Sequence, residues 1–170
     1  MISKRYILRR LKPSDLYSYY KNINDKDIGK NMRDINYPVT LKKAKYHIDE
    51  LKQKNDSMPK TFDVFAIEVD GECAGIISLG NIVMNHKARI GYWLGRRFRG
   101  EGIMTCCVRD MTRYWFDRFK LRRLEGCVVS FNKASARVLE KNGYKFEGIM
   151  KKDRLKNGKY YDTYMYAKLR

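Results

Sequence analysis

Residues 96–104, which read RRFRGEGIM, combine residue types that suit the binding of an anion. Gly100 and Gly102 stand two apart, arginines precede them, and a helical apolar pattern follows. The first N–H groups of a helix lack partners within the helix, and the helix dipole favours negative charge there. Glycine lets the backbone approach an anion closely and adopt a positive φ. The segment therefore predicts a phosphate site, although its spacing fits a glycine-rich turn with surface arginines equally well.

Two common nucleotide motifs and a metal site are not supported by the sequence. No G-x-x-x-x-G-K-[ST] segment is present, which disfavours nucleotide hydrolysis, and the glycine pair lacks the third glycine of the dinucleotide-binding fingerprint. The cysteines and histidines show no clustered metal-ligand spacing, so we predict free thiols and no metal. They are Cys73, Cys106, Cys107, Cys127, His47 and His86.

The composition indicates a soluble globular protein. A length of 170 residues suits one domain over residues 1–170. No apolar run reaches the ~18 residues of a transmembrane helix, and the N-terminal residues lack the apolar run of a signal sequence. We therefore expect a cytoplasmic protein without a membrane partner.

The charge is strongly unbalanced, with 37 Lys and Arg against 19 Asp and Glu, for a net charge of +18. A basic surface attracts polyanions such as RNA or an acidic protein. A genome rich in A and T would give the same excess without a function, because Lys, Asn, Ile and Tyr are all abundant. No RGG tract, RNP signature or zinc knuckle indicates a nucleic-acid module. Both explanations remain open.

Hydrophobic periodicity and turn residues predict the elements that position the glycine segment. The expected order is a strand at 5–11, a helix from about Pro13, a loop or short helical turns at 25–40, a helix from the cap Thr40 to about Lys54, strands at 61–69, 72–82 and 88–95, a helix at 103–119, a strand at 121–130, a helix at 132–144, and two strands around Asn157-Gly158. This order predicts a mixed α/β domain of about seven strands. The glycines lie where a strand ends and a crossover helix begins.

Three segments resemble one family, the GNAT N-acetyltransferase superfamily. Residues 97–102 fit its Q/R-x-x-G-x-G/A motif, within a stretch similar to its fourth strand, pyrophosphate loop and third helix. NKASARVLEKNGYKFEG resembles its N-x-x-[AS] segment, and NGKYYDTYMYAKL resembles the end of the RimJ/RimL-like branch, which modifies ribosomal-protein N-termini. The resemblance implies a single GNAT-like domain with two N-terminal helices, a pyrophosphate-loop helix and a short C-terminal helix.

The resemblance also implies an acetyl-CoA site. The pyrophosphate would lie on the glycine loop, with arginine charge nearby, and the strand ending GYWL would splay from its neighbour. Backbone groups of that strand would bind the pantetheine and, at Leu94, the thioester oxygen. The implied cofactor-binding residues are Tyr92, Trp93, Leu94, Arg97, Arg99, Gly100, Glu101, Gly102, Ile103, Asn132 and Ser135. Simple core packing for the strand, and a helix N-cap for Asn132, are the alternatives.

The implied chemistry is direct attack of a neutral amine on the thioester in a ternary complex. Many family members place a tyrosine that acts as general acid seven residues after the motif asparagine, where this chain has Leu139. Ser135, three residues after Asn132, is the position that the RimL-like branch offers instead. We expect Ser135 to donate a proton to the thiolate or bind it, and an ordinary helix serine is the alternative. Ser135 and Leu94 are thus the expected catalytic residues.

No general base is singled out. Related sequences often carry an acid just before the strand core, where this chain has Arg89. Glu68 and Glu72 lie on preceding strands without a motif. Because an α-amine has a reference pKa near ~8, a water relay suffices, and an acid from residues 25–40 is the other option.

Two classes of function follow. The first is an acetyl-CoA-dependent N-acetyltransferase whose acceptor is a protein N-terminus or a small amine, with a ribosome or acidic protein as partner. The second is a non-catalytic CoA- or RNA-binding protein on the same fold, supported by the missing tyrosine and acid. The positive charge disfavours polycationic acceptors. The sequence does not decide between a monomer and a homodimer.

Overall fold

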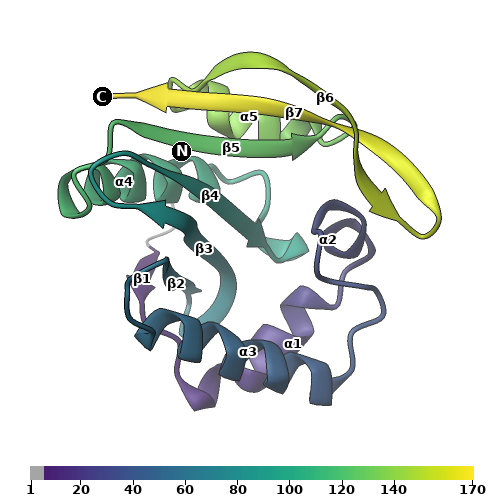
Figure 1. The fold of residues 1–170 in the computed structure, drawn as a ribbon. Helices are drawn as coiled ribbons and strands as arrows, with labels where there is room; N and C mark the ends of the chain where they lie inside the picture. The colour runs from purple at the N-terminus through teal and green to yellow at the C-terminus, as the bar shows by residue number, and fades with distance from the viewer. Residues whose placement is uncertain (1–5) are drawn as a thin grey trace.

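A seven-stranded mixed sheet with helices on both faces organises the computed structural model, which describes residues 6–170 (Figure 1). Its helices and strands are β1 (Ile7–Arg9), α1 (Leu16–Ile23), α2 (Lys26–Asn31), α3 (Leu41–Asp56), β2 (Phe62–Val69), β3 (Glu72–Val83), β4 (Lys87–Leu94), α4 (Ile103–Arg118), β5 (Arg123–Val129), α5 (Lys133–Lys141), β6 (Lys145–Lys156) and β7 (Lys159–Leu169). Short 3₁₀ turns at Pro13–Asp15 and Arg96–Phe98 precede α1 and the glycine loop. The predicted mixed fold is confirmed.

The strand order β1-β2-β3-β4-β5-β7-β6 follows from tight hairpins and one crossover. Asp70 and Gly71 turn β2 into β3 with φ of 50° and 77°, and Asn157 and Gly158 turn β6 into β7 with φ of 49° and 73°. Positive φ at both central residues is the type I′ geometry that matches strand twist. The one parallel pair, β4 and β5, is joined through α4, as parallel strands require.

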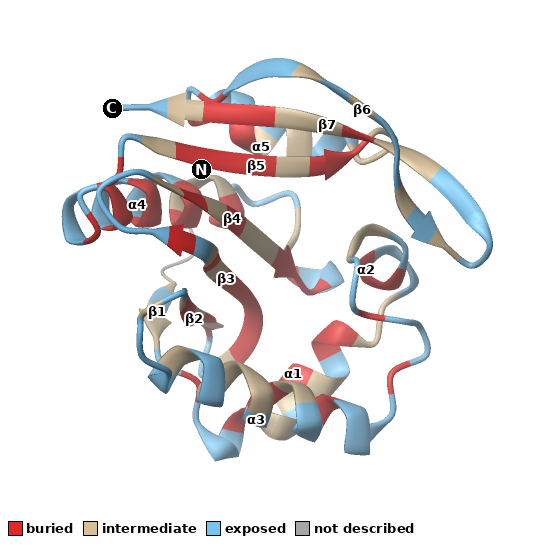
Figure 2. Ribbon diagram, viewed as in Figure 1, coloured by how far each residue is buried: buried red, intermediate tan, exposed pale blue. Residues whose placement is uncertain are grey.

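Two apolar layers fill the space on either side of the sheet (Figure 2). The inner face of α4 packs on one side, where Cys107, Val108, Met111 and Trp115 are buried as the helical spacing predicts. Tyr114, which also falls on the apolar spacing of this helix, is 37% exposed and contacts the ring of Phe65 edge-on. α1 and α3 cover the opposite face.

The segment predicted as a loop or short turns at 25–40 contains one short helix, α2. The Asp25 carboxylate caps it by accepting the N–H of Asp27 at 2.7 Å. α3 begins after Thr40, whose hydroxyl accepts the Lys43 N–H at 3.2 Å, as predicted. All four cysteines are free thiols, and within residues 6–170 no helix is long and apolar enough to cross a membrane. The part of the strand prediction that falls on Arg5 lies outside the described residues.

β4 and β5 separate partway along their length, as the resemblance implied (Figure 1). Their pairing runs from Lys87 opposite Arg123 to Ile90 opposite Gly126 and ends there. Beyond Ile90, β4 continues beside β3 to Leu94, whereas β5 continues beside β7. The backbone edges of β4 and β5 are therefore unpaired with each other next to the start of the glycine loop.

Candidate active site

The glycine loop has the backbone geometry that an anion site needs. Gly100 and Gly102 have φ of 84° and 79°, in the left-handed region that other residues adopt only with strain. A Cβ at either glycine would meet nothing within 4 Å. α4 begins directly after Gly102, and no side chain caps its first N–H groups. Open space, free helical N–H groups and two glycines together fit a pyrophosphate.

The loop is fastened to the end of β4 and to α2. The guanidinium Nε of Arg99 donates to the carbonyl of Leu94 at 2.9 Å. Its terminal nitrogens pair with Asp25 at 3.5 Å and Asp27 at 3.3 Å. Arg96 pairs with the same two carboxylates, at 3.8 and 3.6 Å. This contact holds α2 beside the loop, a role that the sequence did not indicate.

Arg97 forms an ion pair with Glu72, at the start of β3, and its guanidinium lies 4.5 Å from the centre of the Phe98 ring. Arg97 and Arg99, the two arginines predicted to face phosphates, thus already have carboxylate partners. Their charge near a phosphate stays a prediction. The geometry of the loop supports phosphate binding through backbone N–H groups more directly than through these side chains.

The backbone of β4 alternates between its two neighbours. The Gly95 N–H donates to Ala74 of β3 at 2.8 Å. In an antiparallel pair every second residue bonds the same partner, so Trp93 also faces β3, whereas Tyr92 and Leu94 face the side where β5 diverges. The Leu94 N–H is therefore directed toward the opening, as an oxyanion donor must be.

Trp93 does not fit the backbone role expected of it. A side chain on Gly75 would overlap the Trp93 carbonyl, which shows that this carbonyl lies against β3. The Trp93 ring is buried and lies edge-on to Tyr19, with 5.2 Å between ring centres. Alternation along the strand, which the motif does not encode, assigns Trp93 to packing between β4 and α1.

Asn132 and Ser135 lie together at the start of α5. The Asn132 side-chain oxygen accepts the Ser135 backbone N–H at 3.2 Å, so Asn132 is the helix N-cap, and its amide nitrogen is left as a donor. The Ser135 hydroxyl lies 3.0 Å from the Tyr92 hydroxyl. Burial holds the pKa of Tyr92 above its ordinary value, so the phenol is neutral at pH 7. A side-chain pair therefore joins β4 to α5 across the opening.

Leu139 belongs to the core. It occupies the position where many family members have a tyrosine that acts as general acid. It is buried, and a Cβ on Gly126 would approach its Cδ1 to 2.7 Å. Gly126 is the last residue of β5 that pairs with β4. Because Gly126 has no side chain, Leu139 can pack at the point where the strands separate. The Leu139 side chain itself has no proton to donate.

Four of the carboxylates that the sequence offered as bases, Glu68, Glu72, Asp25 and Asp27, are held by arginines. Glu68 pairs with Arg9 and Glu72 with Arg97. The acids of α2 pair with the loop arginines, as described above. Because these carboxylate oxygens are already bonded to cations, a relay through water fits the site better than direct proton removal by one of them.

Glu125 on β5 was missed by the sequence analysis. It lies opposite Arg89, its carboxylate is 3.4 Å from that guanidinium, and it also accepts from Arg123 at 2.9 Å. Burial alone would raise the pKa of Glu125, but the bond from Arg123 and the charges of Lys87 and Arg89 outweigh burial and lower it. The sheet register, invisible in the sequence, places this acid beside Arg89.

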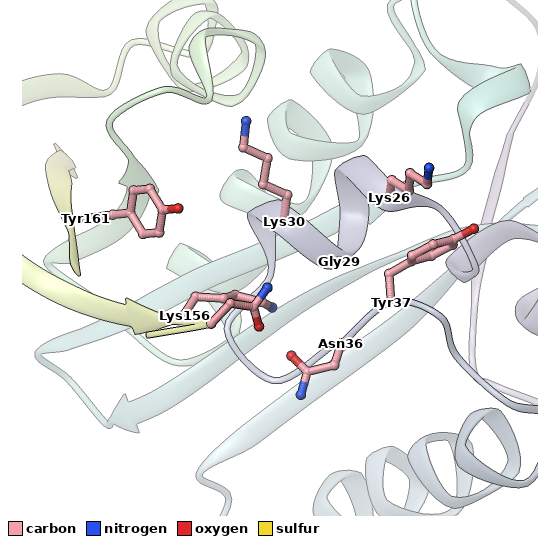
Figure 3. Close-up of a pocket in the computed structure, with 8 residues that line it drawn as sticks. Lys26, Gly29, Lys30, Asn36, Tyr37, Lys156 and Tyr161 are labelled. Carbon is pink, nitrogen blue, oxygen red and sulfur yellow. The ribbon is translucent and has the colours of Figure 1, made fainter. Parts of the chain in front are cut away.

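A second polar feature lies between α2 and the β6–β7 hairpin (Figure 3). It is a pocket of about 230 Å³ lined by three lysines, two tyrosines, two asparagines and a glycine. They are Lys26, Lys30, Lys156, Tyr37, Tyr161, Asn36, Asn157 and Gly29. Within residues 6–170 no group of three or more His, Cys, Asp or Glu residues is arranged to hold a metal ion. The sequence did not single out this pocket, because its walls come from segments far apart in the chain.

Residues 5–145 match the family described as the acetyltransferase (GNAT) domain, which covers most of the chain. This protein therefore belongs to the GNAT acetyltransferase family, with the splayed strands and glycine loop described above. Its fold resembles the solved structure of RimL, a ribosomal L7/L12 alpha-N-protein acetyltransferase in complex with coenzyme A. The TM-score is 0.87 with 26% identity over 99% of this chain and 96% of that chain.

Two curated acetyltransferases are also similar to this chain in sequence. The ribosomal-protein-serine acetyltransferase of Escherichia coli (strain K12) is 32% identical over 108 residues, which are 62% of this chain and 60% of that protein. YdaF of Bacillus subtilis (strain 168) is 36% identical over 102 residues, which are 59% of this chain and 56% of YdaF. The matches therefore span less than two thirds of either relative.

Proposed function

We propose that this protein is an acetyl-CoA-dependent N-acetyltransferase that acetylates a primary amine by direct attack in a ternary complex. One observation carries the proposal. The opening between β4 and β5 lies beside a glycine loop with positive φ and an uncapped helix N-terminus. This combination offers a backbone site for a pyrophosphate and, next to it, free strand N–H groups for an extended polar chain.

Each proposed residue has a stated task. When bound, acetyl-CoA supplies the thioester whose acetyl group passes to the amine. The glycine loop and Ile103 would hold the phosphates through N–H groups, and the Asn132 amide would hold the pantetheine arm. The Leu94 N–H would donate to the thioester oxygen as negative charge develops there.

Ser135 would provide or hold the proton for the departing sulfur. Its hydroxyl is 3.0 Å from the Tyr92 hydroxyl, which donates its own proton to the Ser135 backbone carbonyl at 3.2 Å, so the Ser135 proton can turn either to the Tyr92 oxygen or to the opening. We assign removal of the amine proton to water, because the nearby carboxylates described above are bonded to arginines. An α-amine has a reference pKa near ~8, so a weak acceptor is sufficient.

The acceptor that we favour is the N-terminus of a protein. This choice rests on the similarity to proteins described as ribosomal-protein acetyltransferases, and a ribosomal partner would place the reaction in the cytoplasm. A small amine is the other acceptor class. The similarity to N-acetyltransferases favours this role over non-catalytic binding of CoA or RNA.

Thiol release from acetyl-CoA, measured with a panel of small amines and N-terminal peptides, tests the proposal. We expect turnover that depends on the acceptor, with mass spectrometry showing one acetyl group on the product. Tight binding of coenzyme A without turnover on any member of the panel would contradict the proposal and favour the non-catalytic alternative.

A further inference from the structure

The pocket between α2 and the β6–β7 hairpin is lined by three lysines. Lys26 and Lys30 project from α2, and Lys156 approaches from β6 on the opposite wall (Figure 3). None of its lining residues carries a carboxylate. Three lysines among the eight residues that line about 230 Å³ make the potential around the pocket positive, which attracts an anion.

The hydrogen-bond and ring partners of Lys156 and Lys30 are uncharged, and the Asp34 carboxylate offsets part of the Lys156 charge. The Lys156 ammonium donates to the carbonyls of Met32 and Ile35, at 2.6 Å each, and so fixes the hairpin against the segment after α2. The Lys30 ammonium lies 4.3 Å from the centre of the Phe131 ring. A carbonyl or an aromatic face attracts a cation without neutralising it. The groups that hold the lysines in place are therefore uncharged.

The spacing of the lysines on α2 differs from that on α3. On α3, Lys45 pairs with Asp49 and Lys54 with Glu50, so each i,i+4 pair joins opposite charges. On α2, Lys26 and Lys30 are four apart and face the same pocket. Like charges at this spacing destabilise a helix by a few tenths of a kcal/mol. α2 therefore places two positive charges near one pocket, whereas the lysines Lys45 and Lys54 of α3 are paired with acids.

The pocket adjoins the candidate active site on two sides. Its residue Tyr161 lies edge-on to Phe131, with 5.3 Å between ring centres, and Phe131 directly precedes Asn132. On the other side, Asp25 and Asp27 fasten α2 to the arginines of the glycine loop. The pocket therefore lies between the two segments expected to hold the cofactor, beside the opening that an amine must reach.

We propose that this pocket binds carboxylates of the acceptor and that the enzyme selects peptides with acidic residues directly after the N-terminal residue. The inference rests on the proposed function and specifies its substrate class. Lys26 and Lys30 provide charge from α2, while Lys156 holds the facing wall and adds a third cation. Tyr37 and Tyr161 flank the acidic side chains.

Two peptides that differ only in charge test this selection. One has an N-terminal serine followed by aspartate and glutamate, and the other has asparagine and glutamine in their place. We expect the wild type to show a higher kcat/KM for the acidic peptide. In the double variant Lys26→Gln/Lys30→Gln this preference should fall about fivefold to tenfold, since exposed charge pairs are worth up to ~1 kcal/mol each.

A control variant separates the pocket from the overall charge. Lys42→Gln/Lys141→Gln removes the same two charges from exposed positions on α3 and α5, and it should keep the acidic preference. Coenzyme A affinity, measured by calorimetry, should be unchanged in both variants and shows that they are folded. The reversal Lys26→Glu/Lys30→Glu should make a lysine-containing peptide the better acceptor.

The outcomes are distinct. Equal use of the two peptides by the wild type, or equal loss of preference in the pocket and control variants, would overturn the pocket assignment while leaving acetyl transfer intact. Absence of turnover on every peptide would instead overturn the proposed function on which the assignment rests.

Discussion

The cofactor side and the acceptor side of this protein are built in different ways. The cofactor side consists of backbone, with positive φ at Gly100 and Gly102, N–H groups of α4 and one edge of β4. The proposed acceptor side consists of long side chains that belong to α2 and β6. The hydrogen bond from the Lys156 ammonium to the Met32 carbonyl, at one wall of the pocket, joins residues that are 124 apart in the chain.

This difference predicts different sensitivities. A backbone site depends on which φ values a residue can adopt, so it responds to the replacement of glycine and little to ionic strength. A lysine pocket tolerates changes of shape but responds to charge and salt. Binding the constant cofactor through backbone and the variable acceptor through side chains lets specificity change without loss of the chemistry.

The largest expected effect concerns Ser135, to whose side chain we assign a chemical task on the cofactor side. Ser135→Ala should lower kcat by about 10²–10⁴ with little change in the KM for acetyl-CoA, because its hydroxyl acts on charge that develops during transfer. Tyr92→Phe, which removes the hydroxyl 3.0 Å away, should lower kcat less. Steady-state kinetics of both variants measure this. A Ser135→Ala rate within twofold of the wild type would leave Ser135 as a simple helix residue.

The next effect tests whether the cofactor site is made of backbone. Gly102→Val should weaken acetyl-CoA binding by about 100-fold, since a branched side chain is strained at φ 79° and would occupy the open space beside the loop. Gly158→Val is the matched control, because Gly158 has φ 73° and equally open surroundings in the β6–β7 turn. Calorimetry should show normal affinity for the control. A folded Gly102→Val protein with unchanged affinity would refute the backbone site.

The glycine loop, the N-cap Asn132 and the type I′ turns were predictable from the sequence, since each depends on residues close together in the chain. The sheet register was not predictable. It turns the Trp93 carbonyl toward β3 and brings Glu125 opposite Arg89. The lysine pocket was missed for the same reason, because its lining residues meet only after the hairpin folds onto α2.

Salt should affect the binding of a polyanion to the basic surface more than it affects the binding of coenzyme A. If the basic surface binds ribosomes or RNA, that affinity should fall steeply with the logarithm of salt concentration, by about tenfold or more between 50 and 200 mM, as counterions are released. Coenzyme A affinity should change much less, because backbone N–H groups hold its phosphates. Binding titrations at several salt concentrations compare the two. Undetectable RNA or ribosome binding at low salt would identify the net charge as compositional and favour a small acceptor.

The smallest effect concerns Glu125, which lies one residue before the point where β4 and β5 separate. Because its pKa is lowered by Arg123 and neighbouring cations, its contribution to stability is present at neutral pH and is lost as the pH falls through that lowered pKa. Glu125→Gln should therefore reduce the free energy of unfolding by about 1 kcal/mol at pH 7. Urea unfolding should show this difference shrinking in acid. A difference that is constant with pH would refute the electrostatic assignment.

Mass spectrometry of an acetylated peptide tests the central claim most directly. The peptide should carry both a free N-terminal serine and an internal lysine, and it should be incubated with acetyl-CoA and the wild-type protein. We predict one acetyl group on the α-amine, with one thiol released per product, since the α-amine has a lower pKa than the lysine ε-amine by about 2.5 units and is more often neutral. Acetylation of the lysine with the N-terminus left free would contradict the account.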